Sequence, residues 1–428
     1  MSIIQEKEYQ SRRAAFAKSL KTNSIAVILS AKMQIRSNDT EFPYRQNSNF
    51  YYLTGFKEDK AILVIRKGKK SFETTLFVQK KDKTLELWTG KRVGVNRAKK
   101  IFSFDAVFAV DDFESKISNF LKVSKNIYYD FDINDQRIEF LLSQTKQYAS
   151  RENLALLVAK QRLIKSPIEI KLIKKALSIT KEAHHYAMKQ AKKSFNEREI
   201  QAGVEYIFKK NGAYSDAYTT IVACANSANT LHYISNDKKL VNGALILMDA
   251  GCEYEYYASD ITRTFPVSTH FSSAQKELYS LVLEVEKKII SMIRPNILRS
   301  SLQTKSEELL CKGLVDLGIL KGRVKKLLKK KKHKKYYPHG IGHWMGLDVH
   351  DVCPYKDEKG KEIPLIEGMV LTIEPGIYID KNDKSVPKKY RGIGIRIEDD
   401  ILVTSDGYEN LSSEITKEID EIEAIALS

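Results

Sequence analysis

Two carboxylates stand next to strongly apolar stretches in the middle of this sequence. Asp249 follows the apolar run 245–248, and Asp260 precedes a second strand-like stretch, 261–267. A short continuous apolar run is typical of a strand that is buried on both faces, so we expect Asp249 to lie in the interior. An ionised carboxylate there requires a cation, because an isolated buried charge is so costly that the group would be protonated instead. The spacing suits a hairpin whose two strands carry one acid each at the same level.

A similar arrangement returns later in the chain. Glu374 follows the apolar run 369–373 and, like Asp249, stands two positions before a glycine. Glu398 then lies near the middle of another strand-like stretch, 394–403. A lone acid at a strand end is more often a turn or cap residue, but its repetition favours a shared function. The sequence therefore predicts two related halves, each of which contributes two carboxylates from adjacent strands.

Three histidines, His339, His343 and His350, lie between these halves in a glycine-containing segment. A single histidine is as often structural as functional, whereas three in one such segment favour a site. Glu398 begins a run of three acids, which is typical of a solvated turn, but its strand-like context favours the interior. Four acids and an imidazole that converge on one interior point are what a pair of hard divalent metal ions requires. This oxygen-rich set suits Mn²⁺ better than Zn²⁺, and Co²⁺ often substitutes in such sites.

The elements that must position these residues belong to two predicted domains. Residues 1–165 should form an α/β domain, because strand-like and helix-like stretches alternate there, without a glycine-rich phosphate loop or a catalytic cluster. The second domain, 166–428, begins with Ser166-Pro167-Ile168-Glu169, a capping box with proline at the first helical position. Two further long helices are predicted over 196–211 and 272–294. In the first domain the expected strands are 24–29, 61–65, 75–78, 106–110 and 126–129, and the expected helices lie near 95–101, 113–121 and 135–144.

The composition is that of an ordinary soluble globular protein. With 43% hydrophobic and 29% charged residues, each domain can bury a core of its own. The sequence has no apolar run of membrane-spanning length and no start of the signal-peptide kind, so we expect a cytoplasmic protein without membrane association. Its four cysteines lie far apart, which predicts reduced thiols rather than a disulfide framework or a zinc site.

The formal net charge of +17 raises nucleic-acid binding as an alternative function. The densest cluster of cations lies in residues 321–335, with its core at Lys325–Lys335. No recognition helix, RNP-type aromatic motif or zinc finger accompanies it in the sequence. We therefore interpret this segment as a solvated helix face and loop, and a dedicated acidic or nucleic-acid partner is the alternative.

Taken together, these motifs resemble those of the bacterial Xaa-Pro aminopeptidases (aminopeptidase P) of the pita-bread metallopeptidase superfamily. The resemblance implies a creatinase-like α/β N-terminal domain and an α+β pita-bread catalytic domain with a pseudo-twofold internal repeat. It covers nearly the whole chain, and its part in the first domain distinguishes the chain from methionine aminopeptidases, which lack that domain. The matching segments are 42–56, 249–267, 339–351, 372–376 and 394–400.

The resemblance also implies a metal-binding role for each acid. Asp249 would bind one of two Mn²⁺ ions, and His343 and Glu374 would bind the other, with Co²⁺ or Zn²⁺ as substitutes. Asp260 and Glu398 would bridge the two ions. A water molecule between the ions would attack the N-terminal Xaa-Pro bond of peptides with proline second, and Glu374 would accept its proton.

Further residues are implied to handle the substrate. In the family, the histidines that match His232, His339 and His350 line the substrate site and help to bind substrate or transfer protons. Arg396 resembles an arginine that orients the carboxylates. The nitrogen of an Xaa-Pro bond must be protonated before it leaves, and His339 and His350, with Tyr378, are candidates for walls or donors of a pocket for the pyrrolidine ring. For His232 a structural role is the alternative.

Two rival functions remain open at this point. A prolidase would cleave only Xaa-Pro dipeptides and would bind their free carboxylate with an arginine or a histidine. A non-catalytic pita-bread protein would use the basic surface to bind nucleic acid, but such proteins generally lose metal ligands, and all five are present here. A creatinase-type metal-free hydrolase fails for the same reason. The family further implies a homodimer or homotetramer in which the first domain reaches a neighbouring subunit's site.

Overall fold

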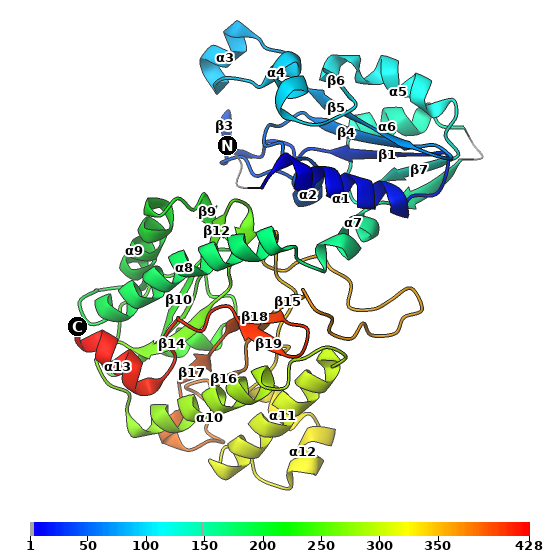
Figure 1. Ribbon diagram of the computed structural model, residues 1–428. Helices are drawn as coiled ribbons and strands as arrows, with labels where there is room; N and C mark the ends of the chain where they lie inside the picture. Colours follow the sequence, from blue (N-terminus) through cyan, green and yellow to red (C-terminus); the bar gives the residue numbers. More distant parts are fainter. Residues whose placement is uncertain (1–3, 147–148) are drawn as a thin grey trace. The chain divides into compact units, whose positions relative to one another are not determined.

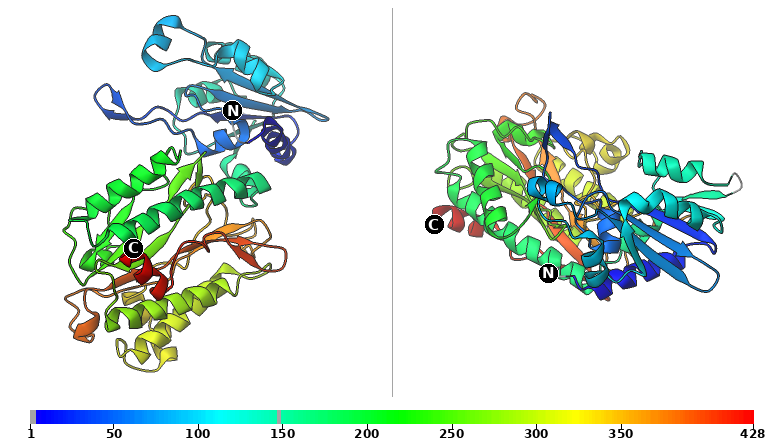
Figure 2. Two further views of the ribbon diagram at one scale, coloured as in Figure 1. Left: turned by 60° about the vertical axis from the view of Figure 1, so that its left-hand side comes forward. Right: turned by 90° about the horizontal axis from the view of Figure 1, so that it is seen from above.

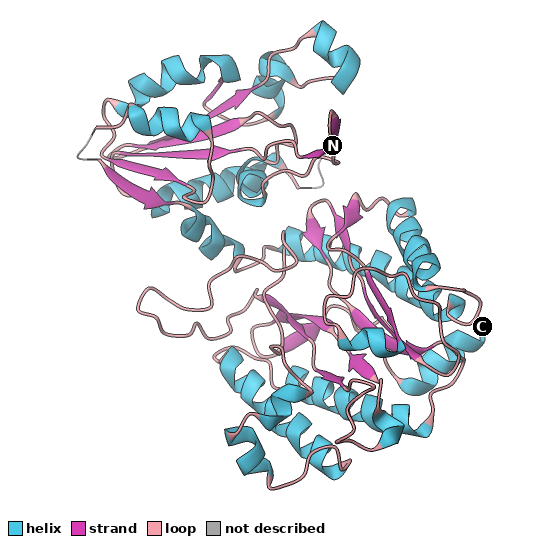
Figure 3. Cartoon of the chain, turned by 180° about the vertical axis from the view of Figure 1, so that it is seen from behind, coloured by secondary structure: helices cyan, strands magenta, loops and turns pink. Residues whose placement is uncertain are grey.

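The computed structural model describes residues 4–146 and 149–428, and the chain divides into two compact units, Met1–Arg162 and Leu163–Ser428 (Figure 1). The first unit is built on a mixed six-stranded sheet in the order β6-β5-β4-β1-β7-β8. Strands β1, β4 and β5 are antiparallel neighbours, and β6, β7 and β8 join in parallel. Every residue of β1 is buried, as expected of a central strand with helices on both faces of the sheet (Figure 3).

The strands of this unit are β1 (Ser24–Leu29), β2 (Ile35–Ser37), β3 (Thr40–Glu41), β4 (Ile62–Lys67), β5 (Phe72–Val78), β6 (Ala106–Ala109), β7 (Asn126–Tyr129) and β8 (Ser150–Asn153). Its helices are α1 (Glu6–Ser19), α2 (Ser48–Thr54), α3 (Lys83–Thr89), α4 (Gly94–Ile101), η1 (Val110–Asp112), α5 (Phe113–Leu121), α6 (Gln136–Ser143) and α7 (Ala155–Arg162). The α/β fold expected here is confirmed, and the expected strands correspond to β1, β4, β5, β6 and β7. Strand β8 is not visible in the hydrophobic pattern, because its residues are polar and lie at the edge of the sheet.

The motif at 42–56 has a structural function that explains its side chains. Gln46 is buried, and its side-chain oxygen accepts hydrogen bonds from the backbone N–H groups of Ala31, at 2.8 Å, and Asn47, at 2.9 Å. Its amide nitrogen donates to the carbonyls of Phe56, at 3.2 Å, and Glu58, at 2.9 Å. The side chain of Asn47 caps helix α2. The motif thus ties four separate backbone positions together around one satisfied buried amide.

The second unit contains two similar halves, in each of which two long helices precede a three-stranded antiparallel sheet. The sheets are β10-β11-β14 and β15-β18-β19. Figure 2 shows helix α10 against the strands of the second half, and helix α11 packs against α10. The helix expected after the capping box at Ser166 is α8, and at its start the Ser166 N–H donates to Glu169 Oε2 at 2.9 Å. This arrangement agrees with the predicted internal repeat.

The strands of the second unit are β9 (Ser215–Asp216), β10 (Ile221–Cys224), β11 (Leu245–Asp249), β12 (Cys252–Tyr254), β13 (Tyr257–Ala258), β14 (Thr262–Pro266), β15 (Val370–Ile373), β16 (Gly376–Tyr378), β17 (Gly394–Arg396), β18 (Asp399–Val403) and β19 (Tyr408–Asn410). The helices are α8 (Pro167–Gln190), α9 (Glu197–Lys210), η2 (Ala225–Asn229), α10 (Ser273–Ile290), α11 (Arg299–Asp316), α12 (Val324–Lys329), η3 (Lys332–Lys335), η4 (Lys388–Tyr390) and α13 (Ile419–Leu427).

The hairpin expected around Asp249 and Asp260 forms, but the two acids do not lie at the same level. Strands β11 and β14 pair so that Asp249 faces Thr262, and Asp260 lies just before β14. The residues in between form a hairpin of their own, β12 and β13. Its turn residues Glu255 and Tyr256 have φ values of 49° and 72°, which are typical of a tight type I′ turn. This inner hairpin shifts Asp260 away from the position opposite Asp249.

The stretch 394–403, expected as one strand, is broken at Glu398. Strand β17 pairs with β16, whereas β18 pairs with β15 in a different sheet. At the break, the Glu398 N–H donates to the Thr262 carbonyl at 3.1 Å instead of continuing a ladder. Glu374 likewise stands between two strands, β15 and β16. Both acids of the second half therefore lie where the chain passes from one sheet to another.

The basic segment 321–335 forms helix α12 and the short helix η3. Most of its lysines are exposed, and two of them form ion pairs, Lys334 with Glu307 at 2.7 Å and Lys335 with Asp383 at 2.6 Å. This exposure agrees with the interpretation of the segment as a solvated face. All four cysteines are buried and free, as predicted. Within the part of the chain that the structure describes, no helix has the length and apolar character needed to cross a membrane.

Arg263, in β14, joins the two halves of the second unit. Its side chain is fully buried; one terminal nitrogen lies 2.7 Å from Asp399 Oδ1 and the other donates to the Glu398 carbonyl at 2.6 Å. A further hydrogen bond of 2.8 Å reaches the Ile415 carbonyl. Burial raises the pKa of a carboxyl group, but the charges of Arg263 and Lys417 outweigh it and hold the pKa of Asp399 far below its usual value. Both partners of this buried pair are therefore charged.

We predict that Arg263→Met destabilises the protein by about 3–5 kcal/mol, because it leaves Asp399 as a buried charge with too few partners. The free energy of unfolding in urea measures this loss. Arg323→Met, at an exposed arginine, is the matched control and should change stability by no more than about 0.5 kcal/mol. Equal effects of the two substitutions would contradict a joining role for Arg263.

Candidate metal centre

One cavity of about 560 Å³ in the second unit is lined by the metal-binding and catalytic residues proposed from the sequence, whereas Tyr378, expected as a further wall residue, does not line it. Acids, imidazoles and one guanidinium group gather on its polar side, and Ile221, Leu231, Ile234 and Val349 form an apolar part of its wall. The site residues expected from the sequence that line it are His232, Asp249, Asp260, His339, His343, His350, Glu374, Arg396 and Glu398.

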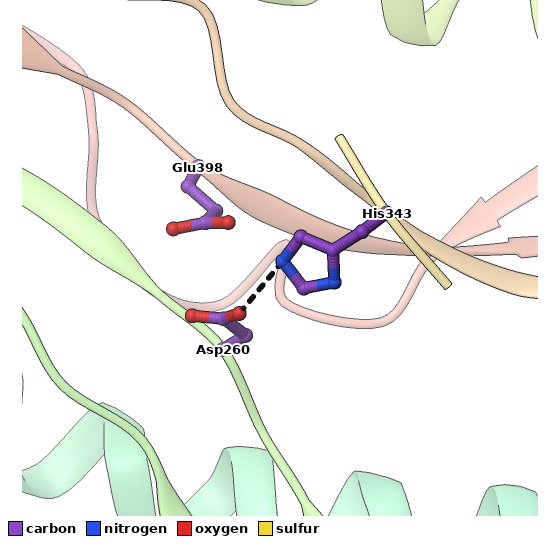
Figure 4. Close-up of side chains that lie close together, drawn as sticks. All are labelled: Asp260, His343 and Glu398. Carbon is purple, nitrogen blue, oxygen red and sulfur yellow. Dashed lines mark ion pairs between the residues drawn. The ribbon is translucent and has the colours of Figure 1, made fainter. Parts of the chain in front are cut away.

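Asp260, His343 and Glu398 form the centre of this group (Figure 4). One potential ligand atom of each lies within 4.8 Å of the others, and His343 Nε2 is 3.2 Å from Asp260 Oδ2. His343 Nδ1 lies 3.0 Å from the Trp344 carbonyl, which can only accept a hydrogen bond. Nδ1 therefore carries the proton toward Trp344, and Nε2 faces the acids, which is the arrangement that suits a metal-binding histidine.

The backbone next to His343 is held tightly against strand β15. Its N–H donates to Thr372 Oγ1 at 3.1 Å, and its carbonyl accepts from the Thr372 N–H at 2.9 Å. A Cβ atom on Gly342 would come within 1.9 Å of the Thr372 carbonyl oxygen, so no larger residue fits at this position. The glycine of the histidine-containing segment thus places the imidazole over the end of β15.

The carboxylate of Asp249 is held by two side chains from other segments. Its Oδ2 accepts from Arg396 Nη2 and its Oδ1 accepts from the Tyr218 hydroxyl, each at 2.5 Å. Arg396 also donates to Thr262 Oγ1 and to the Tyr378 hydroxyl, both at 3.0 Å. The guanidinium group therefore fixes Asp249 and links it to Thr262 and Tyr378. Orientation of the carboxylates by Arg396, as the resemblance implies, has its structural counterpart in these contacts.

The acid run that begins at Glu398 is buried throughout. Glu398 faces the cavity and accepts from Thr262 Oγ1 at 2.7 Å. Asp399 pairs with Arg263, and Asp400 accepts from the Asp260 N–H at 3.1 Å. The reading of this run as a solvated turn is thus wrong, and the expectation of an interior role is confirmed. Each acid has a different function, which no pattern in the sequence distinguishes.

The electrostatics of the cluster favour a bound cation. Burial, followed by repulsion from Asp260, Glu374 and Asp249, raises the pKa of Glu398 well above its usual value. Burial also raises the pKa of Glu374 to about 7, although the charges of His343 and Arg396 oppose this. Carboxylates that repel each other in a buried site are stabilised by a metal ion, which replaces the protons. Four carboxylates and one imidazole fit a pair of hard divalent cations.

His339 is neutral and linked to Arg396 through Tyr378. Burial, followed by the charge of Arg396, lowers the pKa of His339 to about 3. Its Nδ1 lies 2.8 Å from the Gly340 carbonyl, so Nδ1 carries the proton, and Nε2 accepts from the Tyr378 hydroxyl at 2.8 Å. The other side of the same hydroxyl accepts from Arg396. His339 Nδ1 is also 3.6 Å from Glu374 Oε2, which places it within the acid cluster.

The remaining two histidines lie at more exposed positions of the cavity wall. The ring of His350 packs edge-on against that of His343, with 4.1 Å between the centroids. His232 is exposed and lies next to the apolar wall residue Leu231. Two residues that the sequence does not indicate, Tyr218 and Thr262, contact Asp249 and Glu398 directly. Thr262 stands in the strand-like stretch after Asp260 and could have been found there, whereas nothing around Tyr218 in the sequence signals its role.

Comparisons with known proteins agree on one group of relatives. Residues 171–405 match metallopeptidase family M24, and residues 9–128 match the N-terminal domain of aminopeptidase P. The Xaa-Pro aminopeptidase of Escherichia coli K12 is 38% identical over 441 aligned positions, which cover 100% of this chain and 99% of that protein. Xaa-Pro aminopeptidase 3 of Homo sapiens is 36% identical over 99% of this chain and 83% of its own. The Zn-substituted E. coli aminopeptidase P in complex with product superposes with a TM-score of 0.96 at 37% identity, over 100% of this chain and 99% of that one.

We predict that Tyr218→Phe weakens Mn²⁺ binding by about 10–100-fold, because the hydroxyl that orients Asp249 is lost. Titration of metal-free protein followed by calorimetry measures the dissociation constant. Tyr206→Phe, at an exposed tyrosine, is the control and should leave the constant unchanged. Equal dissociation constants for Tyr218→Phe and the unaltered protein would contradict a supporting role for Tyr218.

The metal-free site should hold protons more tightly than the unfolded chain does. Burial opposes the charge of His343, but the hydrogen bond and charge of Asp260 outweigh it and raise its pKa to about 9. With Glu374 at about 7, both folded-state values exceed the unfolded ones. The stability that these protons contribute is therefore present at low pH and lost as the pH rises, for Glu374 through 7 and for His343 through 9.

Because a metal ion displaces these protons, we predict that Mn²⁺ raises the melting temperature more at about pH 8.5 than at about pH 6. Each displaced proton strengthens binding by up to about tenfold per pH unit in this window. Thermal unfolding of metal-free protein with and without Mn²⁺ at the two pH values measures the difference. In His343→Ala the pH dependence should be shallower. The same stabilisation at both pH values would contradict the assigned protons.

Proposed function

Because the chain belongs to metallopeptidase family M24 and carries the N-terminal domain of aminopeptidase P, we propose that it removes the first residue from peptides whose second residue is proline. The observation that carries this proposal is the convergence of four carboxylates and an imidazole on one cavity, next to an apolar wall. The likeness to Xaa-Pro aminopeptidases extends over the full length of the chain, so it includes the first unit and the complete site.

The proposed ligands divide between two Mn²⁺ ions, with Co²⁺ or Zn²⁺ as substitutes. Asp249 would hold one ion, and His343 and Glu374 the other. Asp260 and Glu398, whose carboxylates lie on either side of the His343 ring nitrogen, would contact both. When bound, such a pair of ions lowers the pKa of a water molecule and polarises the scissile carbonyl as a Lewis acid. The oxygen-rich composition of the set supports Mn²⁺.

The chain's own residues would move the protons. Glu374 is proposed to accept the proton of the attacking water, and its pKa of about 7 in the metal-free site fits a group that can both take and return a proton. The proline nitrogen of the substrate must gain a proton before the C–N bond breaks. His339 and His350 lie on the cavity wall and are the proposed donors or binding groups. His232 is proposed to contact the substrate from the exposed side of the cavity.

The apolar wall gives the cavity a place for a proline ring. Leu231, Ile234 and Val349 line the cavity beside the histidines, and they offer no hydrogen-bond donor or acceptor from their side chains. A proline nitrogen within a peptide has no N–H to satisfy, so an apolar surface costs it nothing. We propose that these residues hold the pyrrolidine ring while Tyr378 keeps His339 in position.

Arg396 favours an aminopeptidase over a dipeptidase. A prolidase binds the free carboxylate of its dipeptide with a cationic group, and among the described cavity-lining residues Arg396 is the only arginine or lysine. Its three nitrogens already donate to Asp249, Thr262 and Tyr378. It is therefore not available for a substrate carboxylate, which leaves only a histidine of the cavity for that contact, and longer peptides are the proposed substrates.

We further propose a cytoplasmic homodimer or homotetramer. Trp88 and Leu87 of helix α3 are 82% and 81% exposed, and large apolar side chains in such positions are typical of contact surfaces. They support the expectation that the first unit approaches a neighbouring subunit. Neither nucleic acid nor a membrane is a proposed partner.

We predict that metal-stripped protein does not cleave the tripeptide Arg-Pro-Pro and that added Mn²⁺ starts the release of free arginine, because the metal ions supply the nucleophile. Asp260→Ala should lower kcat/KM by more than about 100-fold, since it removes a direct ligand. Arg323→Met changes an exposed residue that is distant in the sequence from every proposed metal ligand. It is the matched control and should leave kcat/KM unchanged. Chromatography of the products measures both.

The dipeptide Gly-Pro separates this function from its main rival. Cleavage of the dipeptide without cleavage of the tripeptide would make the protein a prolidase. No cleavage of either peptide with Mn²⁺, Co²⁺ or Zn²⁺ would contradict an enzymatic function and favour binding by the basic segment 321–335.

A further inference from the structure

A buried ion pair outside the catalytic cavity lies next to one of the segments that line it. Lys165 Nζ is 3.2 Å from Asp351 Oδ2, and both side chains are only 1% exposed. Neither residue lines the cavity, and the mechanism above uses neither. Burial of two charges is expensive, and in some proteins such a pair specifies one arrangement of the chain. The surroundings of the pair show which arrangement that is.

The pair closes a loop, residues 344–351, that carries part of the cavity wall. The Asp351 N–H donates to the Trp344 carbonyl at 2.9 Å and so joins the two ends of this loop. Inside it, the Gly346 N–H donates to the Asp348 carbonyl at 3.1 Å. The Ala258 N–H, in β13, donates to the Gly346 carbonyl at 2.9 Å. The loop is therefore fixed on the side of Gly346, and its other end depends on Asp351.

Gly346 shows how closely the loop is wrapped around the ion pair. A Cβ atom at this position would lie 2.5 Å from Asp351 Oδ2 and 2.9 Å from Lys165 Cε. Even an alanine would therefore displace the pair. The Lys165 N–H also donates to the Gly368 carbonyl at 2.8 Å, just before strand β15. Lys165 thus links the loop 344–351 to the strand that leads to Glu374.

His350 is the residue that depends most on this anchor. It precedes Asp351 directly and lies on the cavity wall, with its ring against that of His343. Within the described residues, the His350 ring has no hydrogen bond of its own that would hold it. Its position is consequently set by the backbone on either side, and Asp351 is the nearest fixed point.

We propose that Lys165 is a positioning residue for the substrate site and that it acts through Asp351 on His350. The proposal rests on the aminopeptidase function, because His350 is assigned there to substrate binding or proton transfer. A shift of about 1 Å in such a group can cost up to about 100-fold in rate. Loss of the pair should therefore reduce turnover of peptides while the metal ligands, which have other supports, stay in place.

The test uses Lys165→Met and Asp351→Asn in the full-length Mn²⁺-loaded protein, with Arg-Pro-Pro as substrate. Each substitution should lower kcat/KM by about tenfold. The double variant should have the same kcat/KM as either single variant, because both substitutions remove the same interaction. Bound metal per chain should be unchanged. Ile422→Ala, a buried residue of α13, is the control that lowers stability without contact to the loop and should keep its kcat/KM.

The decisive comparison adds Lys165→Met to His350→Ala. If Lys165 acts through His350, adding Lys165→Met to the His350→Ala variant should lower kcat/KM by less than about twofold. The same tenfold loss in both backgrounds, or no loss in either, would overturn the proposal. Should Lys165→Met fail to fold, Asp351→Asn, which keeps the side-chain shape, decides the same question.

A second readout separates this proposal from the proposed function. The second readout is an NMR spectrum of the protein with ¹³C-labelled histidine. The signal of His350 is the one that is missing from the spectrum of His350→Ala. It should shift or broaden in Lys165→Met and remain unchanged in Ile422→Ala, whether or not the protein cleaves peptides. An inactive parent protein with this shift would contradict only the aminopeptidase function. An active parent protein with an unchanged His350 signal in Lys165→Met would contradict only the positioning role.

Discussion

The second unit is organised by the cost of holding like charges together in a buried place. Asp249, Asp260, Glu374 and Glu398 line one cavity, and burial with mutual repulsion raises the pKa of Glu398 well above its usual value. Such a cluster is stable only with protons or with metal ions. The surrounding contacts, Arg396 on Asp249 and Thr262 on Glu398, orient the carboxylates and add too little charge to neutralise them. A pair of divalent cations meets the requirement.

The two halves of the second unit place their acids in the same way. In each, an acid stands at the end of a buried antiparallel strand, Asp249 as the last residue of β11 and Glu374 directly after β15, so that the carboxylate lies where the ladder stops. The partner acids Asp260 and Glu398 lie just before a strand of the same sheet. Arg263 then ties the halves together by its pair with Asp399, the residue next to Glu398. The rigidity of the site therefore comes from the joint between the halves.

The sequence predicts which acids come together in the cavity, because each of them follows or lies within an apolar run and repetition distinguishes it from a turn residue. It predicts α8 from its capping box and five strands of the first sheet from apolar runs. It does not predict the break at Glu398 or the inner hairpin before Asp260, because both depend on backbone partners from distant segments. Tyr218 and the Lys165–Asp351 pair are invisible for the same reason: their chemistry exists only after folding brings remote positions together.

The central claim is that the two halves of the second unit together bind two metal ions in one cavity. Anomalous X-ray diffraction from crystals of Mn²⁺-loaded protein tests it directly, because manganese is located independently of the polypeptide. We expect two peaks in the cavity, one next to Asp249, one next to His343 and Glu374, with Asp260 and Glu398 between them. A single peak, or peaks away from these five residues, would contradict the claim.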